Sequence, residues 1–530
     1  MKYPIYFAQV EEGDSTAQHG AAGRKATANH SPTGSNNPEG QGLFAAHKTI
    51  HVREVKGKFN NFRWLFVWLT QLLYFVTPWL MWNGRPAVWL DLQKRFFYIF
   101  GWTFSPTDVI YMTLVLIICA LALFLFTTVA GRLWCGYTCP QTVYTEIFMW
   151  IERKVEGNRA ARIRLEKAPM GVSKLVKKII KHALWIAVSL AASFTLVAYF
   201  TGAEGTSNGV QLLREIANHE TSFAQVFWIG LYGFIMYLFA GFMREQVCLY
   251  MCPYARFQSV MFDPDTLIVT YDEARGESRG PRKKGVDPKT VGKGDCIDCG
   301  VCVDVCPTGI DIRNGLQYEC IGCGACIDAC NEIMDKMGYE RGLIRYDTEN
   351  GVKNKYTKQQ LIKRTLRPRV LVYSLILLAL FVALFVGIGQ RTKIRMVVER
   401  GDKRTLAVHT EDGLIDNVYK LQLSNTDEKL HTVILSVDGI EGIKIVGKPE
   451  VELDPASTDT KIIRVRVDPA VAKAAEKNEH DNHDAQKKDK EREKDGEQDD
   501  YKSYPIVIHL KSPETNENLE YKSIYYLPKD

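Results

Sequence analysis

The sequence predicts a membrane protein of mixed fold, with five spanning helices, a cysteine-rich soluble insert before the last helix, and a C-terminal β-sandwich. Three observations carry this prediction. Apolar runs of about 20 residues, the length that crosses a bilayer core, recur five times. Eight of the 13 cysteines lie between Cys296 and Cys330. Beyond about residue 391 the chain has no cysteine and alternates apolar with polar residues.

A polar stretch precedes the membrane core. Residues 1–45 are rich in Gly, Ala, Ser, Asn and Thr and have no apolar period, so we expect a disordered cytoplasmic tail. The core is expected over residues 46–260, with a further helix at residues 370–390. The five predicted spans are Trp64–Trp82, Val109–Ala130, Ala183–Thr201, Phe223–Met243 and Val370–Gln390. They contain no histidine, which argues against a bis-histidine membrane haem.

The basic residues predict the orientation of these helices, because loops rich in Lys and Arg stay in the cytoplasm. Ten such residues lie from Arg153 to Lys181, whereas the loop after the third span has Arg214 alone against three Glu residues. We therefore expect the N-terminus inside and the C-terminus outside. The formal charge of +6 is small for 530 residues and collects beside the spans, so no nucleic-acid partner is expected.

The insert at residues 261–369 carries two copies of the spacing C-x2-C-x2-C-x3-C, which is typical of a ferredoxin with two [4Fe–4S] clusters. In such proteins the fourth cysteine of each run ligates the other cluster. The first cluster is assigned to Cys296, Cys299, Cys302 and Cys330, and the second to Cys320, Cys323, Cys326 and Cys306. Zinc sites usually separate their cysteine pairs by a dozen or more residues. Disulfides need an oxidising compartment, whereas the topology places this insert in the cytoplasm.

Two further motifs of the form C-x3-C-P follow the second and fourth spans, both on the expected cytoplasmic side. Their cysteines are Cys135, Cys139, Cys248 and Cys252. Cysteines four apart share a helix face if the helix continues to the proline, which otherwise ends or restarts it. Four thiols suit Cu(I) or an iron–sulfur cluster, or two of them cycle through a disulfide. Simple packing is the expectation for Cys119, and it is favoured over thioether ligation for Met243 and Met251.

The segment from 391 to 530 predicts an immunoglobulin-like antiparallel β-sandwich. Short alternating runs separated by turn residues carry this prediction. They include 419–423, 432–435, 462–467 and 504–508. A charged insertion at 473–500 cannot bury a core, so His480 and His483 within it are expected in a solvated loop and not at a metal.

Nucleotide-binding motifs do not explain this chain. No G-x-G-x-x-G follows a predicted strand, and Gly442–Lys448 has the P-loop spacing but is followed by Pro449 instead of the Ser or Thr that holds magnesium. Electrons are therefore expected from a separate protein or from a quinol.

Taken together, these features resemble the cytochrome c oxidase accessory proteins of the CcoG/FixG/RdxA type. The stretches 82–88 and 96–101 are also similar to the first outer loop of that family, and the resemblance covers about residues 45–530. It implies a multi-pass protein of the bacterial inner membrane with a periplasmic C-terminal domain. It also implies a cupric reductase that supplies Cu(I) during assembly of cbb3-type oxidase, with that oxidase and copper-handling assembly factors as partners. The clusters then relay electrons, and Cys135, Cys139, Cys248 and Cys252 form the candidate copper or redox site.

Two other functions fit the same residues. A quinol-linked electron-transfer subunit would pass electrons to a protein partner and have no copper affinity at the C-x3-C-P motifs. A non-redox assembly scaffold would hold the oxidase through its outer domain, and oxidase maturation would survive the loss of the cluster cysteines.

Overall fold

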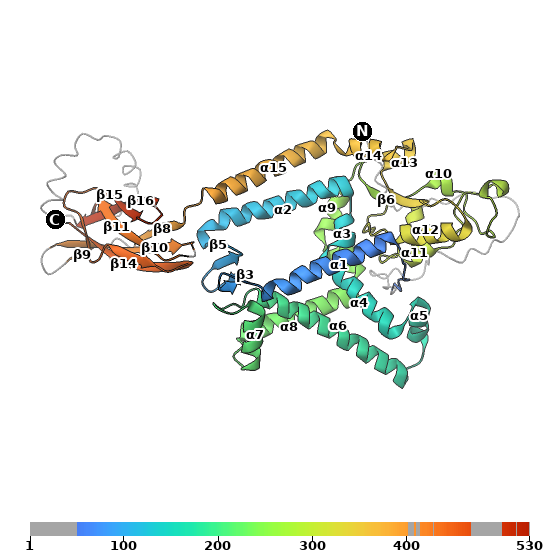
Figure 1. Cartoon of the computed structure of the whole chain (residues 1–530), viewed down its shortest axis with the longest axis horizontal. Coiled ribbons are helices and arrows are strands. Elements are labelled where there is room, and N and C mark those ends of the chain that lie inside the picture. The colour runs from blue at the N-terminus through green and yellow to red at the C-terminus, as the bar shows by residue number, and fades with distance from the viewer. Residues whose placement is uncertain are drawn as a thin grey trace, which may run out of the picture. The chain divides into compact units, whose positions relative to one another are not determined.

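The structure, a computed structural model, describes residues 50–400, 407–409, 414–427, 429–467, 501–515 and 517–528. Within them lie long helices, a cysteine-rich insert and a C-terminal β-domain (Figure 1). The predicted tail, the charged insertion and the histidines His480 and His483 lie outside the described residues. The predictions made for them therefore stay predictions.

Four helices in the described part are long and apolar enough to cross a membrane. They are α2 Val109–Ala130, α6 Val172–Ala198, α8 Phe223–Leu238 with its π-helical continuation Phe239–Met243, and α15 Pro368–Gly389. Three agree closely with predicted spans. The third begins 11 residues before the predicted Ala183, because the basic segment that precedes the apolar run is itself helical, and His182 consequently lies inside α6.

The first predicted span, Trp64–Trp82, is wrong in its bounds. The helix α1 covers Lys58–Val76 and is followed by a 3₁₀ turn, Thr77–Trp79. Pro78 ends the helix because it lacks an amide hydrogen and its ring clashes with the preceding turn. This helix is not among the four that meet the length and composition of a membrane span.

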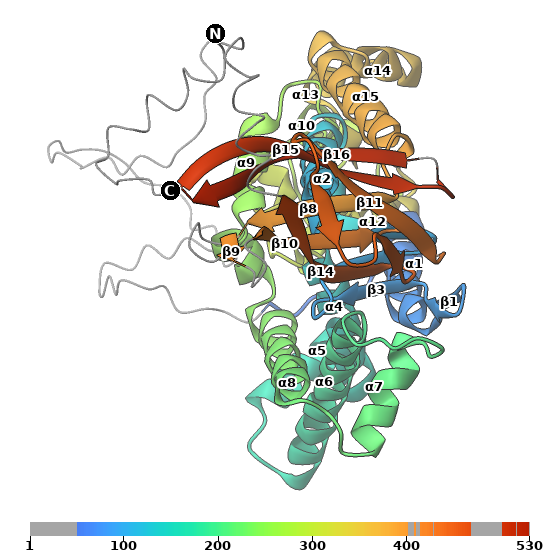
Figure 2. The same cartoon turned by 90° about the vertical axis from the view of Figure 1, so that its left-hand side faces the viewer.

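Small residues bring the long helices together. The hydroxyl of Tyr111 on α2 donates to the carbonyl of Gly387 on α15 at 2.9 Å, and α15 runs beside α2 (Figure 1). A Cβ at Gly233 of α8 would lie 3.2 Å from the Ser193 hydroxyl of α6. Close approach at small residues is how apolar helices gain contact when the hydrophobic effect does not drive association. In Figure 2, α6 and α8 lie together with α7 Asn208–Ala217.

Shorter elements join the long helices. On the side of the C-x3-C-P motifs these are α3 Leu133–Tyr137, α4 Pro140–Glu156, α5 Arg159–Lys167 and α9 Pro253–Met261. Between α1 and α2 lie β1 Met81–Trp82, β2 Arg85–Pro86, β3 Val88–Asp91, β4 Phe96–Ile99 and β5 Trp102–Phe104. Strands β3, β4 and β5 form one antiparallel sheet.

The cysteine-rich insert is built around one antiparallel strand pair, β6 Ile268–Tyr271 with β7 Ile344–Asp347. Its helices are α10 Glu273–Gly276, α11 Val301–Asp304, α12 Ala325–Met337, α13 Glu349–Asn354 and α14 Lys358–Thr365. The pair brings the two ends of the insert together, and the cysteine runs lie between them.

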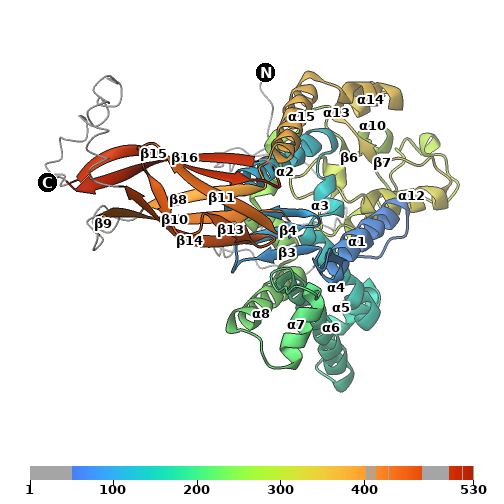
Figure 3. The ribbon, with the colours of Figure 1, turned by 60° about the vertical axis from the view of Figure 1, so that its left-hand side comes forward.

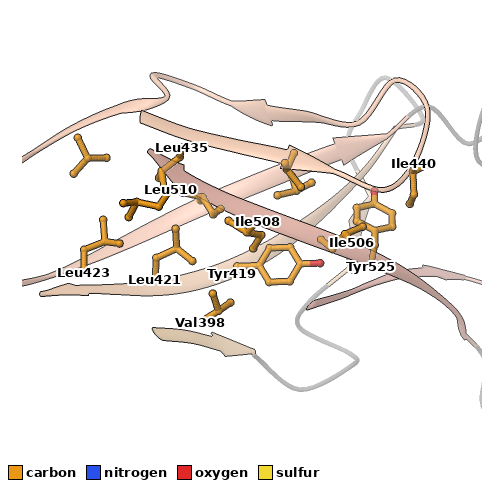
Figure 4. Close-up of a cluster of buried hydrophobic side chains, with 14 of the residues drawn as sticks. Val398, Tyr419, Leu421, Leu423, Leu435, Ile440, Ile506, Ile508, Leu510 and Tyr525 are labelled. Carbon is orange, nitrogen blue, oxygen red and sulfur yellow. The ribbon is translucent and has the colours of Figure 1, made fainter. Parts of the chain in front are cut away.

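The C-terminal β-sandwich is confirmed. One sheet contains β8 Ile394–Arg400, β9 Ala407–His409, β10 Ile415–Asn425, β12 Lys444–Val446 and β14 Ser457–Val467. The other contains β11 His431–Asp438, β13 Glu450–Leu453, β15 Tyr501–Ser512 and β16 Glu517–Pro528 (Figure 3). Alternate side chains of both sheets, including Tyr419, Leu421, Ile508 and Tyr525, are fully buried between them (Figure 4). Each predicted alternating run lies within one of these strands.

Candidate iron–sulfur and thiol sites

The four cysteines assigned to the first cluster line one pocket of the insert. They are Cys296, Cys299, Cys302 and Cys330. Gly300, at the N-terminus of α11, has a φ of 67°, a conformation that glycine adopts without a steric penalty and that turns the loop around the pocket. Three cysteines of one run and the last cysteine of the other therefore line the same space, as a crossed two-cluster ferredoxin requires.

The four cysteines assigned to the second cluster line a second pocket, which Cys302 also borders. They are Cys306, Cys320, Cys323 and Cys326. Gly324 repeats the role of Gly300, with a φ of 74° at the N-terminus of α12. Because Cys302 belongs to the walls of both pockets, the two sites are neighbours. Their donor sets fit two [4Fe–4S] clusters, and the assignment of individual ligands stays a prediction.

Burial disfavours free thiolates at these pockets. It raises the pKa of Cys302, Cys320 and Cys330 to about 12 each, because a buried anion loses its hydration. The guanidinium of Arg313 acts against this shift at Cys302. A coordinated metal deprotonates its thiol ligands outright, so these residues fit metal binding better than free thiolate chemistry.

The C-x3-C-P motifs do not lie on continuous helices. The helix α3 holds Cys135 and ends at Tyr137, and Cys139 then caps α4, which restarts at Pro140. In the second motif Cys248 lies in a π-helical turn, Val247–Met251, and Cys252 caps α9. The condition for a shared helix face is therefore not met, and the helix restarts at the proline in both motifs, as the proline predicts.

The four thiols are nevertheless neighbours. Burial raises the pKa of Cys135 to about 12, and the charges of Cys139 and Cys248 add to the increase. Burial likewise raises the pKa of Cys248 to about 11, with contributions from Cys139 and Cys252. In the described part of the chain no three His, Cys, Asp or Glu side chains are placed around a single metal ion, either at these motifs or at the two cluster pockets.

The two motifs support one another through a buried amide. The thiol of Cys135 donates to Oε1 of Gln258 at 3.5 Å, and Gln258 is fully buried on α9, directly after the second motif. On the other side the hydroxyl of Thr142 donates to the carbonyl of Cys135 at 2.6 Å. The orientation of Cys135 thus depends on both halves of the repeat.

The first C-x3-C-P motif packs directly on the second cysteine run. A Cβ at Gly136, between Cys135 and Cys139, would lie 2.9 Å from the Cα of Cys323 and 2.9 Å from the carbonyl oxygen of Ile321. Only glycine permits this approach. The thiol motif and the loop of the second cluster site are in backbone contact at this point.

Arg132 holds the same junction. Its guanidinium donates to the carbonyls of Tyr318 and of Cys320, the latter at 3.4 Å, and to the carbonyl of Ala255 at 2.7 Å. The side chain is buried, and its charge acts on Cys135 and Cys320. One cation therefore lies between the thiol motifs and the second cluster site.

A small pocket separates Cys248 from the end of the first cysteine run. Its wall includes Arg63, Cys248 and Thr308, and the Thr308 hydroxyl lies 3.3 Å from Sγ of Cys306. Both C-x3-C-P motifs thus border the second cluster site, one through Gly136 and the other through this pocket.

Sequence reasoning missed Arg63, Arg132, Gly136 and Gln258 as site residues. A signal existed for Arg132, since Gly131-Arg132 and Gly241 to Arg244 precede the two motifs at similar distances. The structure shows that the two arginines differ in their roles, because Arg244 donates to the Glu152 carboxylate at 2.6 Å and not to the cysteine runs.

Family comparisons agree with this architecture. Residues 243–349 match a family described as a 4Fe-4S dicluster domain, and residues 112–157 match a 4Fe-4S binding domain. Residues 384–503 match the Ig-like fold at the C-terminus of FixG. The second match includes Cys135 and Cys139, so a family of iron–sulfur proteins extends over the first thiol motif.

Curated relatives match about four-fifths of the chain. Protein RdxA of Cereibacter sphaeroides is 37% identical over 433 residues, covering 80% of this chain and 90% of that protein. Protein RdxB of the same organism is 36% identical over 443 residues, with coverage of 80% and 90%. Nitrogen fixation protein FixG of Rhizobium meliloti is 34% identical over 460 residues, with coverage of 81% and 85%.

Proposed function

Because the chain belongs to the FixG/RdxA family of membrane iron–sulfur proteins, we propose that it reduces Cu(II) to Cu(I) during assembly of a cbb3-type cytochrome c oxidase. The observation that carries the proposal is the contact of Gly136 with the Cys323 backbone, which joins a four-thiol region to a cluster site. A thiol-rich site prefers Cu(I) over Cu(II), and clusters of low potential can reduce Cu(II).

Each residue has a defined part in this mechanism. The eight insert cysteines would hold two [4Fe–4S] clusters, which would supply single electrons when bound. Cys135 and Cys248 offer thiols to the copper substrate, and metal binding releases their protons. Cu(II) gains one electron while its donor loses one. Gln258 orients the Cys135 thiol through its amide oxygen, and Gly136 and Arg132 hold the second cysteine run against it.

A copper-reduction assay tests the proposal. Anaerobically reconstituted protein, reduced with dithionite and freed of excess reductant, should form Cu(I) in proportion to its reduced clusters, as followed with a Cu(I)-specific chelator. Changing Cys135, Cys139, Cys248 and Cys252 together to Ser should abolish this reaction and leave the cluster absorbance intact. Cys119→Ser is the matched control, because Cys119 is exposed on α2 away from the motifs, and it should behave as the wild type.

One observation favours a second candidate, a quinol-linked electron-transfer subunit. Residues 112–157 match a 4Fe-4S binding domain, and this match includes Cys135 and Cys139. The copper proposal instead assigns these two cysteines to binding the copper substrate. If the wild type forms no Cu(I) while its clusters are reoxidised by another acceptor, the copper proposal fails and this candidate replaces it. A scaffold without redox activity requires oxidase maturation to survive loss of the insert cysteines.

The same proposal includes five spans with the N-terminus in the cytoplasm and the C-terminus in the periplasm of the bacterial inner membrane. The helix α1 is the additional span, and its exposed apolar face supports this. Five of its side chains are 57% to 69% exposed, namely Leu65, Trp68, Leu69, Leu72 and Leu73. An apolar patch of this kind on a protein surface marks a membrane or protein contact.

Reporter fusions test this topology. Alkaline phosphatase joined after Asp530 should be active, because the enzyme needs the oxidising periplasm to form its disulfides. The same reporter placed after Thr365, at the end of α14, should be inactive. The opposite pair of results would invert the topology, and activity at both positions would remove α15 as a span.

A further inference from the structure

A polar cavity of about 250 Å³ lies beside the second cluster site, apart from the thiol motifs. Segment 52–55, the start of α1 and one face of α4 line it. Val305 and Ala325 close its far side; they directly precede Cys306 and Cys326, and Ala325 also borders the second cluster pocket. One residue therefore separates this cavity from a redox centre.

A buried charge group forms one wall. The carboxylate of Glu146 lies 3.1 Å from Nη1 of Arg63 and 3.1 Å from Nη2 of Arg153. Arg63 is 6% exposed and Glu146 is 3% exposed. Nε of Arg63 has no hydrogen-bond partner in the part of the chain that the structure describes. A buried donor without a partner costs free energy, so a polar ligand that reached this atom would be stabilised by it.

Three tryptophan rings also line the cavity. Trp64 and Trp150 meet edge to face with their centroids 6.5 Å apart, and Trp68 follows one turn along α1. Trp68 on α1 is 69% exposed, and Trp150 on α4 is 44% exposed. The cavity thus combines an aromatic wall that lipid can reach with a buried carboxylate and guanidinium, which suits a flat ring bearing hydroxyl groups.

We propose that this cavity binds a membrane quinol and that the quinol is the electron donor to the insert. The ring would lie between the tryptophans, one hydroxyl would donate to Glu146, and the other oxygen would accept from Arg63. Oxidation to the quinone breaks two O–H bonds and releases two protons and two electrons. Glu146 would take one proton and water the other, and clusters held at the insert cysteines would accept one electron each, for transfer to two Cu(II) ions.

Charge favours a neutral ring over a lipid phosphate. Arg53, Arg63 and Arg153 line the cavity, but Glu54 and Glu146 line it as well. Two of the three arginines are already paired with Glu146. An anionic headgroup would have to displace or face these carboxylates, whereas a quinol uses the carboxylate as a hydrogen-bond acceptor. The quinol site rests on the proposed function in one respect, which is that Cu(II) is the final acceptor of the electrons.

Binding is measured on the full-length protein with its clusters, in nanodiscs of neutral phosphatidylcholine. Decylubiquinone and a short-chain menaquinone are titrated while tryptophan fluorescence is followed, and an azido-quinone is used to label the site. We expect saturable quenching by at least one quinone, and labelled peptides from α1 and α4. Glu146→Gln and Trp150→Leu should each weaken binding by about tenfold or more, the usual size of a lost hydrogen bond to a charged group or of a lost aromatic contact.

Two matched controls lie outside the cavity. Glu156 is also buried on α4 but pairs with Lys178 and Lys181 and does not line the cavity, so Glu156→Gln should bind quinone as the wild type does. Trp134 on α3 is 41% exposed and also lies outside the cavity, which makes Trp134→Leu the control for quenching. Cluster absorbance identifies variants that fail to fold. If Glu146→Gln fails to fold, Trp150→Leu, which alters a half-exposed side chain, still tests the site.

Three results would overturn the proposal: no saturable quenching, labelling away from α1 and α4, or equal affinity in Trp150→Leu and wild type. A fourth result would also overturn it: phosphatidylglycerol that co-purifies with the wild type, is lost from Arg153→Gln and is not displaced by quinone. That result would make the cavity a site for a lipid headgroup. The copper assay with dithionite is independent of this site. Quinone binding without Cu(I) formation would refute the copper proposal and leave the quinol site in place.

Discussion

Changing Gly136 to Val is expected to remove about half of the cluster iron from the purified protein and to abolish copper reduction. The new side chain would collide with the Cys323 and Ile321 backbone, which lies 2.9 Å from the position of a Cβ. Backbone cannot move aside as a flexible side chain does, so the loop that carries Cys320, Cys323 and Cys326 must shift. Overpacking of this kind costs about 1–3 kcal/mol of stability and would displace the ligands of the second site.

Iron content and Cu(I) yield are measured together, with Gly230→Val as the control. Gly230 lies within α8, and apart from the adjacent backbone of that helix no atom of the described residues lies within 4 Å of its Cβ position, so the same substitution there adds a helical valine without a collision. We expect full iron and full Cu(I) yield from this control. A Gly136→Val protein that keeps all its iron and its copper reduction would show that the contact is not needed for electron transfer.

Replacing Arg132 with Gln is expected to lower the reduction potential of the second cluster by about 60 mV or more, which corresponds to roughly 1.4 kcal/mol for one electron. Reduction adds a negative charge to a cluster, and a nearby buried cation stabilises that charge. Arg132 lies next to the Cys320 carbonyl, and its charge acts on the Cys320 thiol. Removing the cation therefore makes this cluster harder to reduce. The potential is read by anaerobic redox titration with paramagnetic resonance detection.

Arg313 provides a matched control at the other cluster. It lines the first pocket and acts on Cys302, but it also pairs with Asp311 at 2.7 Å and Asp298 at 2.5 Å. Because these carboxylates offset its charge, Arg313→Gln should shift the first cluster by less than Arg132→Gln shifts the second, and it should leave the second unchanged. Equal shifts of both clusters in either variant would contradict this assignment.

The same contacts lead us to propose an order of electron transfer. Gly136, the pocket beside Cys248 and the cavity at Ala325 all border the second cluster site. The pockets of both sites are themselves lined by residues of the insert. The second cluster is therefore the one through which electrons would enter from the quinol and leave to copper, and the first would hold the second electron of a two-electron donor.

Features encoded over short stretches of chain were predictable. A cluster takes three of its ligands from one loop, so the spacing of Cys320, Cys323 and Cys326 identifies the site before any fold is known. Apolar runs long enough to cross the bilayer core as a helix identify spans in the same way. The alternation of apolar and polar residues identified the strands around Tyr419. The error at Trp82 arose because Trp and Tyr are equally common at a membrane interface and in the short strands that follow Pro78.

By itself, then, the sequence determined the two cluster sites, four of the membrane helices, the β-sandwich and the family, since each depends on local spacing, length or periodicity. The tertiary structure alone decided how these parts are joined. Arg132 and Cys320 are 188 residues apart, and Arg63 and Glu146 come from different helices. No local pattern encodes such pairs, because they arise only when packing brings distant segments together. The packing of distant segments also places the C-x3-C-P thiols beside the second cluster site and forms the cavity next to it.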